Sequence, residues 1–240
     1  MSCSFCGFAS TDADQSSLSP SPFQSNGIFF EIIERSELTG FTLHPLEREA
    51  LGSVASEKRK IDFSLGRAAA HRALSRFDIP AEIPILRGES REPLWPVGIV
   101  GSIAHASGYG VAAVAREGDY RGLGVDIQKI EERYTDHLIS RFADPDEFEW
   151  VCSDASKRTE RAVRLFSAKE SVFKALYPIG RVWFAFDVAH LSPCESEDRF
   201  HATVRLPSIS KSAISLEVGV IQYENHIITG ATLTMGIDCT

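Results

Sequence analysis

Short runs of apolar residues bounded by glycine and proline recur along the chain and predict β-strands. The runs cover residues 28–33, 83–86, 97–103, 110–115, 123–127, 183–188, 200–206, 215–223 and 226–233. Two longer stretches, residues 47–77 and 156–176, have the spacing and composition of helices instead. The pattern therefore predicts two groups of strands, each associated with one long helix.

The two predicted helices resemble each other in sequence. Aligning their Ala-Leu endings pairs residues 66–74 with residues 168–176 and places Arg67 over Lys169. Only the second helix carries an acid, Glu170, at the next position, where the first has alanine. We predict an α+β fold of two similar α/β subdomains, each with a small antiparallel sheet and a long helix, in a pseudo-twofold arrangement. Chance similarity between two amphipathic helices is the alternative.

Three parts are expected along the chain. Residues 1–26 are rich in serine and poor in apolar anchors, which predicts a flexible N-terminal tail. Residues 27–120 would form the N-terminal subdomain and residues 121–240 the C-terminal subdomain.

Composition and charge exclude several classes of protein. Of 240 residues, 43% are hydrophobic and 24% charged, which is ordinary globular composition. The net charge of −8 argues against a nucleic-acid-binding protein, so an anionic ligand needs a local basic patch. Residues 93–115 carry no charged side chain, but their glycines, serines and alanines predict buried strands and no membrane span.

The five cysteines favour reduced thiols in a cytoplasmic protein. Cys3 and Cys6 have CxxC spacing, but no second pair follows to complete a zinc site.

A carboxylate stands in the middle of the predicted strand at residues 122–128. Strand alternation places Gly124, Asp126 and Gln128 on one face of the strand. A half-buried aspartate needs a cation, a metal or several N–H donors. An edge-strand aspartate in contact with water is the alternative.

A second acid lies four residues before a lysine in the second predicted helix, so Glu170 and Lys174 share one helical face. A surface ion pair would explain this spacing. The flanking apolar residues favour a magnesium-phosphate site instead, with the acid on the metal or taking a proton and the lysine on a phosphate oxygen.

Basic residues concentrate in the two predicted helices. Residues 57–76 and 156–174 each contain six basic residues and two acidic ones within an otherwise acidic chain. Solvated helix faces explain either cluster alone. Two clusters at equivalent places favour an anion held between the halves. The role of His105 stays open between a structural and a functional one, because a lone histidine is more often structural.

Together and in this order, these motifs resemble the 4′-phosphopantetheinyl transferases of the Sfp/EntD type. The resemblance extends from about Arg59 to Leu176 and is carried by Phe63-Ser64-Leu65-Gly66-Arg67, Arg91-Glu92-Pro93-Leu94-Trp95-Pro96, Gly101-Ser102-Ile103-Ala104-His105, Gly124-Val125-Asp126-Ile127 and Phe166-Ser167-Ala168-Lys169-Glu170 with Lys174.

The resemblance implies transfer of 4′-phosphopantetheine from coenzyme A to a serine of an acyl or peptidyl carrier protein, with magnesium and release of adenosine 3′,5′-bisphosphate. It implies catalytic roles for Asp126, Glu170 and Lys174, and magnesium ligands at Asp126, Gln128 and Glu170. Coenzyme A would lie between the halves, on Arg59, Arg67, Arg87, Ser102, His105, Lys169 and Lys174. The N-terminal subdomain would bind coenzyme A and the C-terminal subdomain would supply the metal and catalytic groups.

Two residues depart from the family pattern. Gln128 stands where the family usually has a second acid, so we expect weaker metal binding, because an amide oxygen brings no charge. Ala104 replaces a serine or threonine before the histidine, which removes one hydroxyl contact to phosphate.

Two other functions remain open from the sequence. One is a magnesium-dependent phosphohydrolase that uses the same acids with water as nucleophile. The other is a non-catalytic coenzyme A or nucleotide-binding module. For the transferase, we expect a monomer that docks an acidic carrier protein on Arg158, Arg161 and Arg164.

Overall fold

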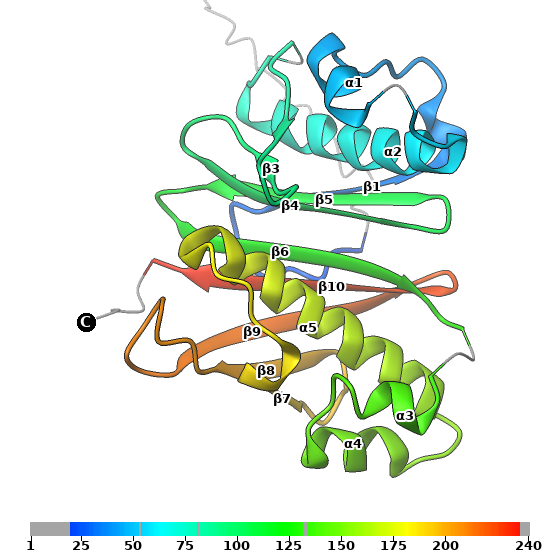
Figure 1. The fold of residues 1–240 in the computed structure, drawn as a ribbon, viewed down its shortest axis with the longest axis vertical. Helices are drawn as coiled ribbons and strands as arrows, with labels where there is room; N and C mark the ends of the chain where they lie inside the picture. The colour runs from blue at the N-terminus through cyan, green and yellow to red at the C-terminus, as the bar shows by residue number, and fades with distance from the viewer. Residues whose placement is uncertain (1–19, 53, 81, 132–133, 236–240) are drawn as a thin grey trace, which may run out of the picture.

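The computed structural model describes residues 20–52, 54–80, 82–131 and 134–235. Two antiparallel sheets stack along the long axis of the molecule, and each has one long helix against it (Figure 1). The predicted α+β fold of two similar subdomains is confirmed.

The N-terminal sheet has strand order β1 (Phe29–Glu34), β5 (Tyr109–Arg116) and β4 (Ile99–Ala106). Helix α2 (Glu57–Leu74) covers one face of it, and its alanines and Leu65 form a buried cluster with Val114. Smaller elements flank this layer: η1 (Arg35–Leu38), α1 (Pro45–Leu51), η2 (Ser75–Phe77), β2 (Leu86–Arg87) and β3 (Pro93–Leu94).

The C-terminal sheet has the order β6 (Tyr120–Lys129), β10 (His226–Thr234), β9 (Ile214–Tyr223), β8 (Arg199–Val204) and β7 (Ala189–Pro193). Helix α5 (Arg158–Gly180) crosses one face of this sheet (Figure 1). The segment between β6 and α5 contains α3 (Asp136–Ile139) and α4 (Pro145–Cys152), and η3 (Phe186–Val188) leads into β7.

A third buried cluster joins the two halves. Val111 and Ala113 of β5 meet Val125 and Ile127 of β6 there, and Ile228 of β10 contributes to the same cluster. Because residues of both sheets share this cluster, apolar packing joins the two halves.

Glycines allow each long helix to lie close to its sheet. A Cβ on Gly110 of β5 would lie 2.7 Å from the backbone nitrogen of Gly66 in α2. A Cβ on Gly124 of β6 would lie 2.8 Å from the backbone nitrogen of Ala175 in α5. The same close helix–strand approach thus occurs once in each half.

Several predicted elements differ from the structure. The helix expected over residues 47–77 is two helices, because the chain turns at Gly52 with φ +86° before Ser56 caps α2. The strand expected at residues 183–188 is wrong, because η3 occupies its end and the strand β7 begins only at Ala189. Of the strand expected at residues 83–86, only Leu86 lies in a strand.

Residues 1–19 of the predicted tail lie outside the described residues. Within residues 20–26, Phe23 lies 5.9 Å from Phe30 between ring centroids, and the backbone oxygen of Asn26 accepts a hydrogen bond from the Tyr120 hydroxyl at 2.8 Å. The predicted subdomain boundary at residues 120 and 121 stays a prediction. Among the described residues, no helix combines the length and apolar character that a membrane crossing requires.

Candidate active site

The strand β6 presents the central carboxylate of the site to helix α5. Asp126 is buried, and its Oδ1 accepts a hydrogen bond from Lys174 Nζ at 2.7 Å. Its Oδ2 accepts hydrogen bonds from Ser167 Oγ and from Gln128 Nε2, each at 3.0 Å. The predicted alternation along the strand is thus seen in the contacts, because Gly124 on the same face also meets α5. The alternative of a solvated edge-strand aspartate is wrong for Asp126.

Glu170 lies in α5 one turn before Lys174 and close enough to Asp126 for the two carboxylates to repel. Burial raises the pKa of the Glu170 carboxyl, and the charge of Asp126 raises it further. The ammonium of Lys174 offsets part of this shift. A carboxyl with a raised pKa is better suited to take a proton near neutral pH than an ordinary glutamate is.

The oxygen atoms of this group fit a magnesium ion. Asp126 and Glu170 supply hard carboxylate oxygens. The amide of Gln128 lies next to Asp126 and faces it with Nε2, so rotation of the amide would be needed to offer its oxygen to the ion. A divalent cation would relieve the repulsion that the two carboxylates exert on each other. The residues present are therefore compatible with the predicted metal site, although Gln128 adds no charge to it.

Three arginines from the N-terminal half form a cluster of like charges. Burial lowers the pKa of Arg67 to about 10, with Arg87 and Arg59 adding to the decrease against the opposing effect of Glu47. Burial and the charges of Arg59 and Arg91 also lower the pKa of Arg87. Positive charges that repel one another in this way favour a bound anion.

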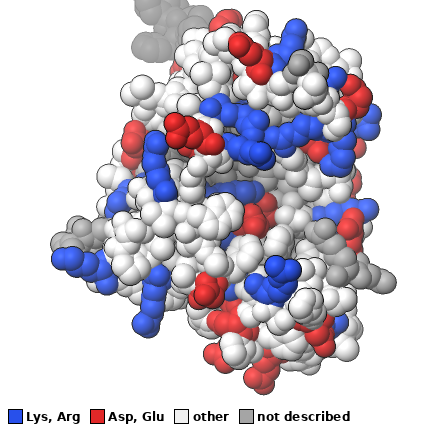
Figure 2. Space-filling model, viewed as in Figure 1, with Lys and Arg blue, Asp and Glu red and all other residues white. Residues whose placement is uncertain are grey.

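Lys and Arg side chains gather in a band across the N-terminal half, above a hollow in which acidic and basic atoms lie together (Figure 2). His105 of β4 connects the arginine cluster with the carboxylates. Burial lowers its pKa, Asp62 opposes this, and both Arg59 and Lys174 lower it further. Both cations therefore act on one imidazole, so the arginine cluster and the Lys174–Asp126 pair both lie near His105.

Ser102 of β4 holds the two halves together at this site. Its side chain is buried, and its Oγ accepts a hydrogen bond from the backbone N–H of Val125 in β6 at 3.0 Å. The predicted contact of Ser102 with coenzyme A stays a prediction, but the hydroxyl already has a structural partner next to Asp126.

Lys169 faces away from the predicted phosphate site. Its side chain is 1% exposed, and Nζ lies 2.7 Å from Glu147 Oε2. Nζ also donates hydrogen bonds to the backbone oxygens of Phe186 at 3.1 Å and Ala189 at 2.9 Å. The structure therefore does not support the predicted phosphate contact, because the ammonium is buried and its donors are used within the protein.

A cleft of about 780 Å³ opens beside Lys174, between the two halves of the molecule. Its walls carry Trp95 from the N-terminal half and Phe173, Tyr177 and Trp183 from the C-terminal half. The lining also includes charged residues, namely Arg91, Glu92, Arg121 and Arg181, so the cleft combines an aromatic surface with charged groups.

Two buried acids at the periphery were not found by the sequence analysis. Glu47 and Glu147 lie beneath Arg67 and Lys169 and are 0% and 2% exposed. A signal was present in both cases, because each is the third residue of a helix that begins His-Pro or Asp-Pro and closes a capping box.

Comparison with known families agrees with this geometry. Residues 47–115 match the 4′-phosphopantetheinyl transferase N-terminal domain, and residues 122–229 match the 4′-phosphopantetheinyl transferase superfamily. The second match contains Asp126, Glu170 and Lys174.

Individual relatives lead to the same family. The chain is 37% identical over 155 residues to 4′-phosphopantetheinyl transferase Svp of Streptomyces mobaraensis, covering 64% of this chain and 62% of Svp. It is 34% identical over 173 residues to 4′-phosphopantetheinyl transferase Npt of Nocardia iowensis, covering 68% of this chain and 75% of Npt. Enterobactin synthase component D of Salmonella typhi is 37% identical over 122 residues, half of each chain. The chain belongs to the 4′-phosphopantetheinyl transferase superfamily.

Proposed function

We propose that this protein transfers the 4′-phosphopantetheine arm of coenzyme A to a serine of an acyl or peptidyl carrier protein and releases adenosine 3′,5′-bisphosphate. One observation carries the proposal: Asp126, Glu170 and Lys174 converge at one end of a site whose other end is an arginine cluster. Pyrophosphate and a terminal phosphate on one nucleotide match these two ends.

Each group has a role in this reaction. The carrier serine gives its proton to Glu170 while its oxygen bonds to the phosphorus that bears the pantetheine arm. The bond from that phosphorus to the bridging oxygen breaks, and the electron pair leaves with adenosine 3′,5′-bisphosphate. Lys174 stabilises the negative charge that develops on the departing phosphate.

Magnesium, when bound by Asp126, Gln128 and Glu170, would neutralise charge on the pyrophosphate. Asp126 keeps Lys174 in place through the 2.7 Å contact between Oδ1 and Nζ. Arg59, Arg67, Arg87 and His105 would hold the adenosine end, chiefly through its 3′-phosphate. The aromatic cleft beside Lys174 would receive the pantetheine arm.

The predicted carrier-docking residues are not part of this proposal. Arg161 pairs with Glu197 at 2.6 Å, Arg164 pairs with Glu160 at 2.6 Å, and Arg158 pairs with Asp136. The basic cluster at the beginning of α5 therefore serves intramolecular ion pairs. This explains the local charge without an anion between the helices at that point.

The experiment is intact-protein mass spectrometry of an apo carrier protein incubated with this chain, coenzyme A and magnesium. We expect a mass gain of one phosphopantetheine that disappears with Glu170→Ala or with EDTA. Turnover of coenzyme A without a carrier would support the phosphohydrolase. Binding of coenzyme A with no transfer to any carrier would support the binding module.

We also propose that the enzyme works as a monomer in the cytoplasm, where coenzyme A and carrier proteins are available. Cys152 and Cys194 are free thiols, as expected there. Light scattering during size-exclusion chromatography tests the oligomeric state, and cell fractionation tests the location.

A further inference from the structure

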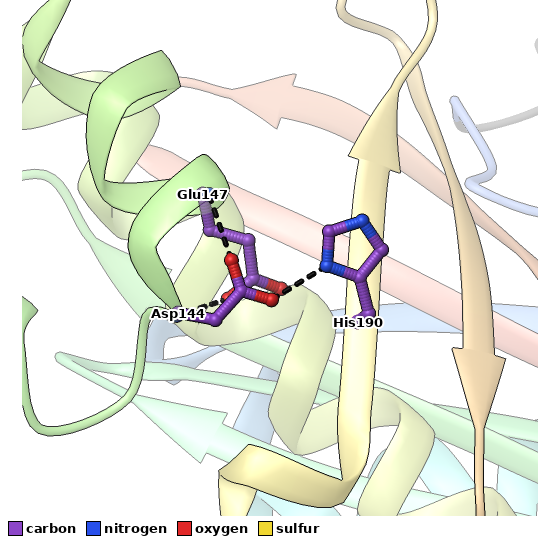
Figure 3. A group of neighbouring side chains, drawn as sticks. All are labelled: Asp144, Glu147 and His190. Carbon is purple, nitrogen blue, oxygen red and sulfur yellow. Dashed lines mark hydrogen bonds and ion pairs between the residues drawn. The ribbon is translucent and has the colours of Figure 1, made fainter.

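Asp144, Glu147 and His190 form a compact group between the beginning of α4 and strand β7 (Figure 3), and their potential ligand atoms lie within 4.8 Å of one another. The hydrogen bonds explain this group without a metal. Glu147 Oε1 accepts from the backbone N–H of Leu191 at 2.8 Å, and Oε2 accepts from the backbone N–H of Asp144 at 2.7 Å. Oε2 also contacts the ammonium of Lys169, so this carboxylate already has a cation.

The N-terminal half contains the same arrangement. Glu47 Oε1 lies 3.8 Å from Arg67 Nε, and both side chains are buried. Glu47 Oε1 accepts from the backbone N–H of Ile85 at 2.9 Å, and Oε2 accepts from the backbone N–H of His44 at 3.1 Å. Each acid therefore accepts from the backbone N–H of the residue before its own helix and from that of a residue just before or within a strand, and each lies beside a basic residue of the long helix. The contact with that basic residue differs between the halves: Glu147 pairs directly with Lys169 at 2.7 Å, whereas Glu47 Oε1 lies 2.8 Å from His71 Nε2 and Arg67 approaches it only to 3.8 Å.

The correspondence extends to the sequence. Arg67 and Lys169 occupy equivalent positions when the long helices are aligned by their Ala-Leu endings. Glu47 and Glu147 are both third in a short helix that begins with proline. One correspondence lies on the long helices and an independent one lies on the short helices. Both halves therefore contain the same arrangement, in which a buried glutamate of the short helix lies beside a basic residue of the long helix.

The cation of each pair lies near one end of the proposed active site. Arg67 belongs to the arginine cluster, and Lys169 directly precedes Glu170. The ammonium of Lys169 connects α5 to α4 through Glu147, to η3 through the Phe186 oxygen and to β7 through the Ala189 oxygen. Two segments, α4 and the continuous stretch of η3 and β7, thus fix the turn of α5 that carries Glu170.

We infer that Lys169 and Glu147 are a positioning pair, which sets the place of Glu170 relative to Asp126, and that Lys169 does not contact phosphate. The inference rests on the proposed function. Release of Lys169 toward a phosphate would leave Glu147 charged and unpaired in the interior, which is costly. A displacement of about 1 Å in a catalytic group is enough to slow a reaction by up to 10²-fold.

The test compares Glu147→Gln, Lys169→Met and the double variant with the wild-type chain in carrier modification. We expect each single change to lower kcat by about tenfold or more and to raise the magnesium concentration for half-maximal rate. The KM for coenzyme A should stay within about twofold of wild type. The double variant should be no slower than either single variant, because both changes remove one interaction.

Two further variants separate positioning from general loss of stability. Lys169→Arg should restore part of kcat, because the equivalent residue Arg67 is an arginine beside a buried glutamate. Glu197→Gln breaks the Arg161 ion pair of the same helix, so it should lower Tm without lowering kcat at a temperature where it is folded.

Different results would overturn the inference or the proposed function. Wild-type transfer with unchanged kcat in Glu147→Gln would overturn the inference alone. A KM for coenzyme A raised tenfold or more in Lys169→Met, with normal kinetics in Glu147→Gln, would restore the phosphate contact. If the wild-type chain modifies no carrier, the proposed function fails and the inference fails with it.

Discussion

Glu170 occupies a position that disfavours its own charge. Burial and Asp126 raise its pKa, so the folded protein binds this proton more tightly than the unfolded chain does. Such a group makes its whole contribution to stability at pH values below its pKa in the unfolded chain. That contribution is lost as the pH rises through its pKa in the folded protein. At neutral pH the ionised carboxylate is therefore destabilising, as expected for a group whose proposed role is to take a proton and bind a metal.

The variant Glu170→Gln, which replaces the carboxylate with a neutral amide of the same shape, tests whether the charge destabilises the folded protein. We expect Glu170→Gln to abolish transfer while raising the free energy of unfolding of the metal-free protein by about 0.5–1 kcal/mol at pH 7. The difference should shrink as pH falls toward 4.5, the ordinary pKa of a glutamate, since the wild-type carboxyl then becomes protonated. Urea denaturation with EDTA at several pH values measures it. A less stable variant at pH 7 would contradict the argument.

Gln128 is the second residue whose charge, here zero, matters at the proposed metal site. Its Nε2 donates to Asp126 Oδ2 at 3.0 Å, which places the amide beside one proposed ligand. We expect Gln128→Glu to lower the magnesium concentration for half-maximal rate several-fold, because a third negative charge joins the site. Magnesium titration of the transfer rate checks this. An unchanged dependence would show that position 128 is not at the metal.

Single residues also show which parts of the site were accessible from sequence. The alternation of strand β6 correctly predicted that Asp126 shares a face with Gln128, because the period of a strand is rigid. The direction of Lys169 could not be predicted. Its partner Glu147 is 22 residues away in the chain, and adjacency to Glu170 gave no information about a buried ion pair.

At the scale of elements, the beginning of α5 is attached to its surroundings by arginines. Arg161 Nη1 donates to the backbone oxygen of Trp150 at 3.0 Å and to Ser153 Oγ at 2.8 Å, while Nη2 pairs with Glu197 at 2.6 Å. These bonds connect α5 to the end of α4 and to the turn before β8. Arg161 therefore joins α5 to neighbouring elements, whereas charge alone suggested that it binds a carrier protein.

We expect Arg161→Ala to lower the free energy of unfolding by about 2–3 kcal/mol, because Glu197 loses its closer cation and keeps only Lys157 at 3.5 Å, and two oxygens lose a donor. The association rate with a carrier protein should stay at the wild-type value. Arg199→Ala is the matched control, since Arg199 is 40% exposed and should cost less than about 1 kcal/mol. Urea denaturation measures the free energy of unfolding of both variants, and stopped-flow mixing measures their association rate with the carrier protein. If folded Arg161→Ala associates more slowly than the wild type, Arg161 is part of the docking surface after all.

Element prediction failed where tertiary contacts decide the structure. The end of the strand expected at residues 183–188 is instead a 3-10 turn, and the Phe186 oxygen in that turn accepts a hydrogen bond from Lys169. Long strands such as β5 and β10 were found because each is a nearly continuous apolar run, and nearly all of its residues are buried in the structure.

The whole molecule combines duplication with a shared interior. Val111 and Ala113 of one sheet and Val125 and Ile127 of the other belong to one buried cluster. Ser102 Oγ bonds the Val125 N–H across the same junction. The hydroxyl of Tyr109 in β5 donates a hydrogen bond to Glu224 Oε2 at 2.5 Å, and this hydrogen bond raises the pKa of Tyr109 to about 12. The two halves are thus joined by apolar and polar contacts.

This junction predicts one cooperative unfolding transition despite the internal repeat. Tryptophan is a natural reporter of each half. Trp95 lies in the N-terminal half and donates to the Gly101 oxygen at 2.9 Å, and Trp150 packs edge-to-face against Phe200 in the C-terminal half. Two variants that each retain only one of these tryptophans, with the others changed to phenylalanine, should show coincident urea transitions, each referenced to circular dichroism of the same variant.

Adding Ser102→Ala to both reporter variants then tests the connection between the halves. The change leaves the Val125 N–H without its partner, so we expect the free energy of unfolding to fall by about 1–2 kcal/mol. Both reporters should move to lower urea by the same amount, because the lost bond belongs to neither half alone. If the Trp95 transition moves and the Trp150 transition does not, the halves unfold separately, and the site between them would then be assembled by docking of two independent units.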